Sequence, residues 1–135
     1  PGLPPTGSPA TDGVVIGYQF FGSSAIYPGG SYAPPYNRGR TTTHEVGHAL
    51  GLRHIWGDSN CGNDYCDDTP AAANGNYTCV FNFSCQSADM IENYMDYTDD
   101  SCMNIFTTGQ KARITTVMNN SPRRASLKTS TKMFP

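Results

Sequence analysis

The chain has 135 residues and a formal net charge of −2, which is enough for one hydrophobic core but not for a second independent domain. Its few Lys and Arg residues form no long run, and this argues against nucleic acid or a membrane surface as a partner. No apolar stretch approaches the roughly 18 residues that a membrane span requires. We therefore expect one domain, with a loop-rich composition typical of extracellular proteins.

The first secondary-structure signal in the chain is the run GVVIGYQFF. The preceding residues, 1–12, are rich in proline and cannot propagate a helix or a central strand. β-branched and aromatic residues bounded by Asp, Gly and Ser favour an extended conformation. We predict a strand at 14–21, followed by a surface loop rich in Pro, Gly and Tyr.

Two helices are predicted further along the chain. The segment RTTTHEVGHAL and the glycine after it predict a helix over about 40–51. Residues 57–89 are dominated by Asn, Asp, Gly, Ser and Cys, so they predict a long functional or metal-stabilised loop. Thr107 or Thr108 can cap a second helix, which we expect to run from about 107 to 119 and to end before Pro122.

The first predicted helix carries a metal-binding pattern. His44 and His48 lie at positions i and i+4 of H-E-V-G-H, so both imidazoles face the same side. Gly51 permits a sharp turn, after which His54 can return as a third ligand. Three protein nitrogens and one open position define a catalytic zinc site, with Glu45 beside the metal as general base and acid.

The alternative for a lone histidine is a surface position or a satisfied place in the core. That interpretation fails here because all three histidines of the chain lie in this one motif. A closed structural zinc site would also have no use for Glu45.

The residues around this motif resemble a known family. HEVGHALGLRH followed by NYMDY resembles the metzincin clan of zinc metalloproteinases, and GLRHIWGD, DDTP and NYMDYTDDSCMNIFTTGQ resemble its pappalysin (cytophagalysin) family. The resemblance covers roughly residues 12–118. It implies an α/β (α+β) zincin fold, with a mixed sheet above the cleft, an active-site helix and a loop-rich lower subdomain that ends in a C-terminal helix.

Pappalysin catalytic domains are longer than this chain. The resemblance therefore implies that residues 1–135 are the C-terminal portion of a metzincin catalytic domain, truncated at the N-terminal side. An upstream segment or a partner chain would complete the domain. The strand at 14–21 would then be the edge strand on which an extended substrate lies.

The resemblance also assigns roles to residues near a Met-turn at about 93–97. Met95 would form the floor of the zinc site, although a methionine alone could simply fill a gap in the core. Tyr97 would stabilise the tetrahedral intermediate, and the alternative is a packed aromatic residue. Asp100, rather than Asp99, would contact Arg or Lys just after the cleaved bond; a solvated acidic turn is the alternative.

Acidic and hydroxyl side chains are concentrated in the loop that follows His54; they are Asp58, Asp64, Asp67, Asp68 and Thr69. Such oxygen donors suit calcium, and by resemblance to pappalysins we expect one or two ions, with Asp67, Asp68 and Thr69 as ligands. The alternative is a solvated acidic loop.

Five cysteines lie between Cys61 and Cys102. Their clustering favours disulfides formed in an oxidising compartment over a zinc site built from cysteines. The family resemblance suggests one bridge from the segment 61–66 to Cys85 and one from Cys79 to Cys102. Cys66 is then left over, either free or paired outside the chain.

The sequence thus predicts a secreted zinc-dependent endopeptidase that acts on protein or peptide substrates. The main alternative is a catalytically silent pseudo-protease that keeps zinc and only binds peptides. A hydrolase of another substrate class is a second alternative, and the third histidine and NYMDY argue against it.

Overall fold

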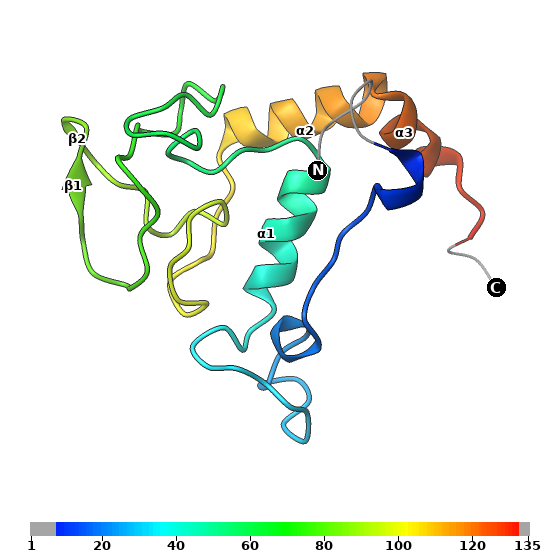
Figure 1. Ribbon diagram of the computed structural model, residues 1–135, viewed down its shortest axis with the longest axis horizontal. Helices are drawn as coiled ribbons and strands as arrows, with labels where there is room; N and C mark the ends of the chain where they lie inside the picture. Colours follow the sequence, from blue (N-terminus) through cyan, green and yellow to red (C-terminus); the bar gives the residue numbers. More distant parts are fainter. Residues whose placement is uncertain (1–7, 133–135) are drawn as a thin grey trace.

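The computed structural model describes residues 8–132, and its main elements are two helices packed at an angle (Figure 1). Helix α1 (Arg40–Ala49) stands in the middle, and α2 (Thr108–Asn120) crosses its C-terminal end. A short helix, α3 (Pro122–Ala125), follows α2. Three 3-10 helices complete the helical content of the described residues: η1 (Pro9–Thr11), η2 (Tyr18–Phe20) and η3 (Ser126–Thr129).

The start of α1 is held by a residue far away in the chain. Its N-cap, Gly39, has no side chain with which to bond the free N–H groups of the first turn. The buried carboxylate of Asp100 takes that role, because its Oδ2 accepts from Arg38 N at 2.6 Å and from Arg40 N at 3.2 Å. A carboxylate at this end of a helix also interacts favourably with the helix dipole.

The end of α1 is a Schellman motif built on Gly51. Gly51 has φ 92°, which favours glycine, and its N–H donates to His48 O at 2.9 Å. Leu52 N donates to Gly47 O at 3.0 Å and completes the motif. The helix predicted at 40–51 is therefore present, and the glycine turns the chain back toward it.

The first turn of helix α2 is hydrogen-bonded to the predicted Met-turn. Thr107 and Gln110 form a capping box. The fully buried side chains of Gln110 and Asn93 then pair through two hydrogen bonds, of 2.9 and 3.1 Å. Asn93 Oδ1 also accepts from Met95 N at 2.9 Å, so the helix and the turn form one unit.

The core lies between these elements. Its buried members come from the segment after α1 and from the Met-turn, and they are Leu52, Ile55, Cys66, Ala72 and Met95. Partly buried side chains pack around them: Trp56, Met90, Phe106 and Ile114. The core therefore lies directly beneath the C-terminal half of α1.

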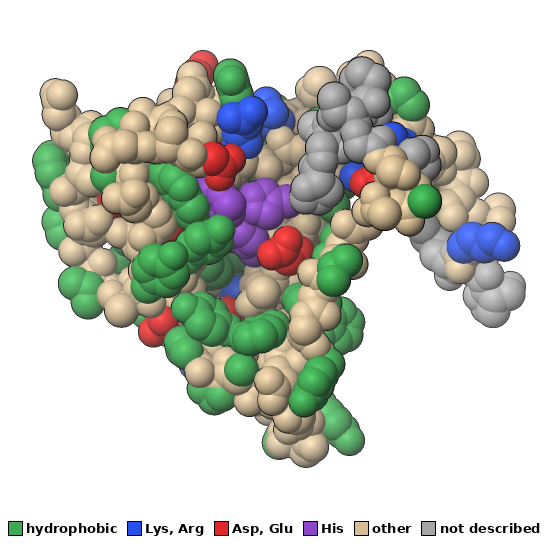
Figure 2. Space-filling model, in the orientation of Figure 1, with side chains coloured by type: hydrophobic (Ala, Val, Ile, Leu, Met, Phe, Trp, Pro, Cys, Tyr) green, Lys and Arg blue, Asp and Glu red, His purple; other side chains and the backbone are tan. Residues whose placement is uncertain are grey.

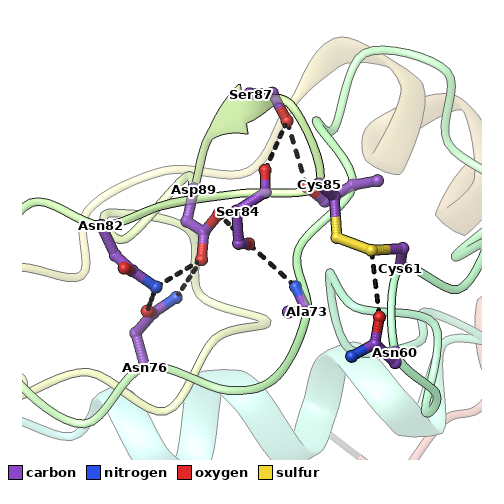
Figure 3. The surroundings of a disulfide bond; sticks show 10 residues. Asn60, Cys61, Ala73, Asn76, Asn82, Ser84, Cys85, Ser87 and Asp89 are labelled. Atoms are coloured by element: carbon purple, nitrogen blue, oxygen red, sulfur yellow. Dashed lines mark hydrogen bonds between the residues drawn. A yellow bond between two sulfur atoms is a disulfide. The ribbon is translucent and has the colours of Figure 1, made fainter.

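The loop region predicted at 57–89 is confirmed as largely irregular, with one hairpin. Strands β1 (Phe83–Ser84) and β2 (Ser87–Ala88) pair antiparallel, and they are the only sheet among the described residues. Figure 3 shows how the buried Asp89 ties this hairpin to the preceding loop, by accepting from Asn76, Asn82 and Ser84. The mixed sheet expected above the cleft is not present within residues 8–132.

The strand predicted at 14–21 does not form. Residues 14–17 have no ladder partner, Tyr18–Phe20 form η2, and the nearest pairing is an isolated bridge between Ser23 and Arg38. A strand is stable only when a neighbour satisfies its backbone groups and covers one face. Residues 8–132 supply neither, and Val15 is 90% exposed. The expected edge for an extended substrate is therefore absent from the described chain.

The C-terminal helix predicted at 107–119 corresponds to α2, which ends at Asn120. Helix α2 ends before Pro122, as predicted, and Pro122 opens α3, where its missing N–H costs nothing. Arg124 of α3 donates to Ala49 O at 2.5 Å and pairs with Asp12. Within residues 8–132, no helix combines the length and apolar character needed to cross a membrane.

Both predicted disulfides are confirmed. Cys61 is bonded to Cys85, and Cys79 to Cys102. Cys66 is the free cysteine, and it is buried in the core, where burial raises the pKa of its thiol to about 11. The bridges link the loop after His54 to the hairpin (Figure 3) and the hairpin region to the segment after the Met-turn.

Candidate zinc site

The three histidines converge on one point. His48 Nε2 lies 3.0 Å from His44 Nε2 and 3.1 Å from His54 Nε2. Helix α1 presents the first two on one face, and the Gly51 turn brings back the third. Figure 2 shows the three side chains together in a central hollow of the surface, open to solvent.

Each imidazole is oriented by its other ring nitrogen. Nδ1 of His44 lies 2.7 Å from Tyr94 O, and Nδ1 of His48 lies 3.0 Å from Leu52 O. Nδ1 of His54 faces the carboxylate of Asp58. All three partners are acceptors, so each Nδ1 carries the proton and each Nε2 presents a lone pair.

This donor set fits zinc. Nitrogens held about 2.0–2.1 Å from a tetrahedral zinc lie about 3.4 Å from one another, close to the separations seen here. Burial, followed by the neighbouring His48, lowers the pKa of His44 from 6.5 to about 4. Burial likewise lowers the pKa of His54, although Asp58 opposes the shift. Neutral imidazole, the form that binds metal, is therefore favoured.

Met95 lies directly beneath the motif helix, as the Met-turn prediction requires. It is fully buried, and a Cβ added to Gly47 would approach its Sδ to 2.5 Å. Gly47 therefore lets the thioether pack against the backbone of α1 between the two helical histidines. Ile55 N donates to Met95 O at 3.3 Å, which links the Met-turn to the segment carrying His54.

Tyr97 reaches the metal-binding nitrogens. Its hydroxyl lies 2.8 Å from His54 Nε2. Burial, followed by the neighbouring Tyr77, raises the pKa of Tyr97, so the hydroxyl remains a proton donor. Its backbone N–H donates to Asp96 Oδ1 at 2.8 Å, and that buried carboxylate is also bonded to Asn76.

A pocket of about 240 Å³ opens beside the histidines. Glu45, His44 and Tyr97 line it together with aromatic and acidic side chains, which are Phe20, Tyr36, Tyr77, Asp96 and Asp100; Thr41 and Met103 complete the lining. Asp100 is 2% exposed, and its Oδ1 has no hydrogen-bond partner, whereas its Oδ2 holds the start of α1. The pocket thus combines aromatic walls with an unpaired carboxylate oxygen.

Two of the residues predicted to bind calcium, Asp68 and Thr69, make hydrogen bonds within the chain. Asp68 accepts from Thr107 Oγ1 and Gly109 N, both at 2.7 Å, at the start of α2. Thr69 donates to the buried Asp64 at 2.6 Å, and Asp67 is exposed. Among the described residues, the three histidines form the only group of three or more His, Cys, Asp or Glu side chains able to hold one ion.

Two residues of the site were missed in the sequence. Asp58 was grouped with the acidic loop, but its carboxylate contacts His54. Trp56 was given no role, but its indole ring stacks on the imidazole of His54, with centroids 4.3 Å apart and an interplanar angle of 4°. The spacing from His54 to Asp58 is i to i+4 across a glycine, which is a signal for a tight turn that could have revealed the contact.

The motif helix, the third histidine after a glycine turn and the methionine beneath them define the metzincin class of metallopeptidase. A family model matches residues 23–119, and its description is pregnancy-associated plasma protein-A, peptidase family M43. This match covers more than half of the chain. The chain belongs to the M43 (pappalysin) family of metallopeptidases.

Individual relatives agree with this assignment. An extracellular metalloprotease of Colletotrichum graminicola is 43% identical over 122 residues, which cover 73% of this chain and 44% of the relative. An extracellular metalloprotease of Arthroderma benhamiae is 46% identical over 110 residues, covering 76% and 35%. Among solved structures, mature mirolysin of Tannerella forsythia in complex with a cleaved peptide matches with a TM-score of 0.75 at 43% identity, over 88% of this chain and 46% of that one.

The chain thus spans less than half the length of each of these relatives. Its fold is that of the corresponding part of a metzincin.

Proposed function

We propose that this chain carries the zinc-binding and catalytic part of a secreted endopeptidase. The observation that carries the proposal is the convergence of three oriented imidazoles beside Glu45 and Tyr97 at an open pocket. The metalloprotease names of the relatives support it, as does the cleaved peptide in the mirolysin structure. Their extracellular designation and the two disulfides support secretion.

Zinc held at this site would supply a Lewis acid, which makes water nucleophilic near neutral pH and polarises the scissile carbonyl. Glu45, next to His44 at the pocket, accepts the proton of the attacking water and delivers it to the departing amine. The Tyr97 hydroxyl donates a hydrogen bond to the oxyanion. This interaction is stronger with the charged oxyanion than with the neutral carbonyl of the bound substrate. His44, His48 and His54 would hold the ion.

The same pocket supports a preference for Arg or Lys just after the cleaved bond. Tyr36 and Phe20 can flank the aliphatic part of such a side chain, and aromatic faces attract cations. Asp100 Oδ1, buried and unpaired, can accept the charged end. Replacing Asp100 by Asn is expected to weaken this preference in a positional peptide library. A library with an apolar preference at this position would contradict the proposal.

Calcium in the loop after His54 is a further part of the proposal. Its support is the concentration of oxygen donors between Asp64 and Thr69, with Asp67 exposed and Asp68 at the loop surface. Loss of heat stability on selective removal of calcium is the expected result. Unchanged heat stability would indicate that these residues act only through their hydrogen bonds and bind no calcium.

The experiment that tests the function is cleavage of casein or a quenched peptide by the full natural protein. A zinc chelator should abolish cleavage and added zinc should restore it. Replacing Glu45 by Ala should leave zinc bound and lower turnover by about 10²–10⁴-fold or more. A zinc-containing wild-type protein that binds peptides without cleaving them would establish the pseudo-protease alternative.

A further inference from the structure

The third histidine of the site lacks the support that a helix gives to the first two. His44 and His48 belong to α1, whose backbone hydrogen bonds hold their Cα atoms in place. His54 lies five residues beyond the helix end at Ala49, in an irregular segment. Three constraints on a loop residue must therefore come from its neighbours: its position, its ring orientation and its tautomer.

The turn that follows His54 supplies these constraints. Gly57 N donates to His54 O at 2.9 Å, which closes the turn. Trp56 covers one face of the imidazole in a parallel stack. Asp58 then contacts Nδ1 at the ring edge, on the side away from the metal-binding nitrogen.

The backbone of this turn is shaped to bring Asp58 to that place. Gly57 and Asp58 both have left-handed φ values, 60° and 64°. A side chain on Gly57 would collide with the backbone of Asn63, so the turn packs against the loop behind it. Aspartate tolerates the left-handed conformation better than most residues. The conformation of the turn alone therefore accounts for a residue of this shape at position 58, but not for its negative charge.

Among the three zinc-site histidines, His54 is the one whose Nδ1 faces a charged acceptor. The corresponding partners of His44 and His48 are the neutral carbonyls of Tyr94 and Leu52. A carboxylate forms a stronger hydrogen bond with an imidazole N–H than a carbonyl does. It also makes the opposite nitrogen a better metal ligand.

We propose that Asp58 is a positioning residue that fixes the tautomer and orientation of His54 and so retains the zinc ion, with Trp56 supporting the ring from its face. The inference depends on the zinc site proposed above and adds the group that compensates for the position of His54 outside the helix. Asp58 need not touch substrate for this role.

The test is a zinc-affinity measurement on the full natural protein, made by competition with a chromophoric chelator. Asp58→Gly keeps the left-handed backbone and removes the carboxylate, and it should weaken zinc binding by about 10–100-fold. Asp58→Asn keeps both the backbone conformation and an acceptor but loses the charge, so its loss should be smaller. Glu92→Gln, which removes a charge that makes no hydrogen bond to a histidine, should bind zinc as the wild type does.

The single tryptophan gives a second readout. Trp56 is the only tryptophan of the chain, so the change of its fluorescence on zinc addition reports on the His54 stack directly. Asp58→Gly should shift that change to higher zinc concentration by the same factor. If the Gly and Asn variants both matched wild-type affinity, Asp58 would have only a conformational role and the inference would be overturned. A wild-type protein without affinity for zinc would instead overturn the zinc site itself.

Discussion

The zinc-site region and the N-terminal segment of this chain differ sharply in packing. The zinc-site region comprises α1, residues 50–72 and the Met-turn at 93–97, and it contains buried side chains such as Leu52, Ile55 and Met95. The N-terminal segment, residues 13–36, has no buried residue, and its apolar side chains Val15 and Ile26 are 90% and 87% exposed.

The difference shows which part of this chain is stabilised by contacts among its own described residues. The zinc-site region is held together by contacts within the described chain: a Schellman turn, a buried Asn–Gln pair and the disulfide from Cys61 to Cys85. Within the N-terminal segment, residues 14–21 resemble a strand in composition but have no strand to pair with among the described residues. Substitutions in the zinc-site region should therefore be costly, and substitutions in the N-terminal segment should not.

The largest effect is expected at the contact between Met95 and Gly47. Met95→Ala leaves a cavity beneath α1 and should lower the free energy of unfolding by about 2–5 kcal/mol. Gly47→Ala instead overfills the same space and should cost about 1–3 kcal/mol. Urea denaturation of each variant measures both losses.

The double variant provides the control for this contact. Because the smaller side chain at 95 makes room for the methyl group at 47, the two losses should sum to more than the loss in the double variant. If the two losses of stability were strictly additive, the two residues would not share one space. The proposed close packing of Met95 against Gly47 would then be wrong.

A smaller loss is expected at Asp68, which links the acidic loop to α2. Asp68→Ala removes acceptors for Thr107 Oγ1 and Gly109 N at the start of α2, and with calcium chelated it should lower the midpoint of thermal unfolding slightly. Thermal unfolding with and without a calcium-selective chelator measures this shift. A larger loss of stability in the presence of calcium would support the proposed ion. No loss in either condition would mean that Asp68 neither binds calcium nor stabilises the start of α2.

The ion pair between Asp12 and Arg124 links the residue just before the N-terminal segment to α3. Arg124 is the main cause that lowers the pKa of Asp12 from 3.8 to about 2. A carboxylate with a lowered pKa stabilises the fold above its unfolded value, and this contribution is lost as the pH falls from about 4 to about 2.

Asp12→Asn should therefore unfold more readily at neutral pH and lose less stability over that acid range. Chemical denaturation at a series of pH values makes the comparison. Parallel stability curves for the variant and the wild type would mean that the pair contributes nothing.

The smallest effect is expected at Val15 in the N-terminal segment. Val15→Ser changes a side chain that is already in solvent, so the free energy of unfolding of this chain should change by no more than about 0.5 kcal/mol. A loss comparable to that of Met95→Ala would mean that the segment packs against something, and the contrast between the two regions would fail.

The features of the fold that the sequence predicted are local. The helix expected at 40–51 follows from the segment RTTTHEVGHAL and Gly51, and the helix at 107–119 follows from a cap at Thr107 or Thr108. The convergence of the three histidines also follows from helical geometry and one glycine turn. The disulfide pairing, by contrast, came from family resemblance.

The features that were missed depend on contacts between distant residues or on a neighbouring strand. No local pattern indicates that Asp100 holds the start of α1, or that Arg124 reaches both Ala49 and Asp12. The strand at 14–21 was predicted from composition, but strand formation requires pairing, which composition does not supply. Asp58 was assigned by its charge to the acidic loop, whereas the turn at Gly57 directs it to His54.

The central claim is that three imidazoles bind zinc and leave one position open. X-ray absorption at the zinc edge of the purified full natural protein tests it most directly. The account predicts three nitrogens at about 2.0–2.1 Å and one oxygen ligand, with the metal lost in His48→Ala. Sulfur ligands at about 2.3 Å would instead indicate cysteine coordination and would contradict the account.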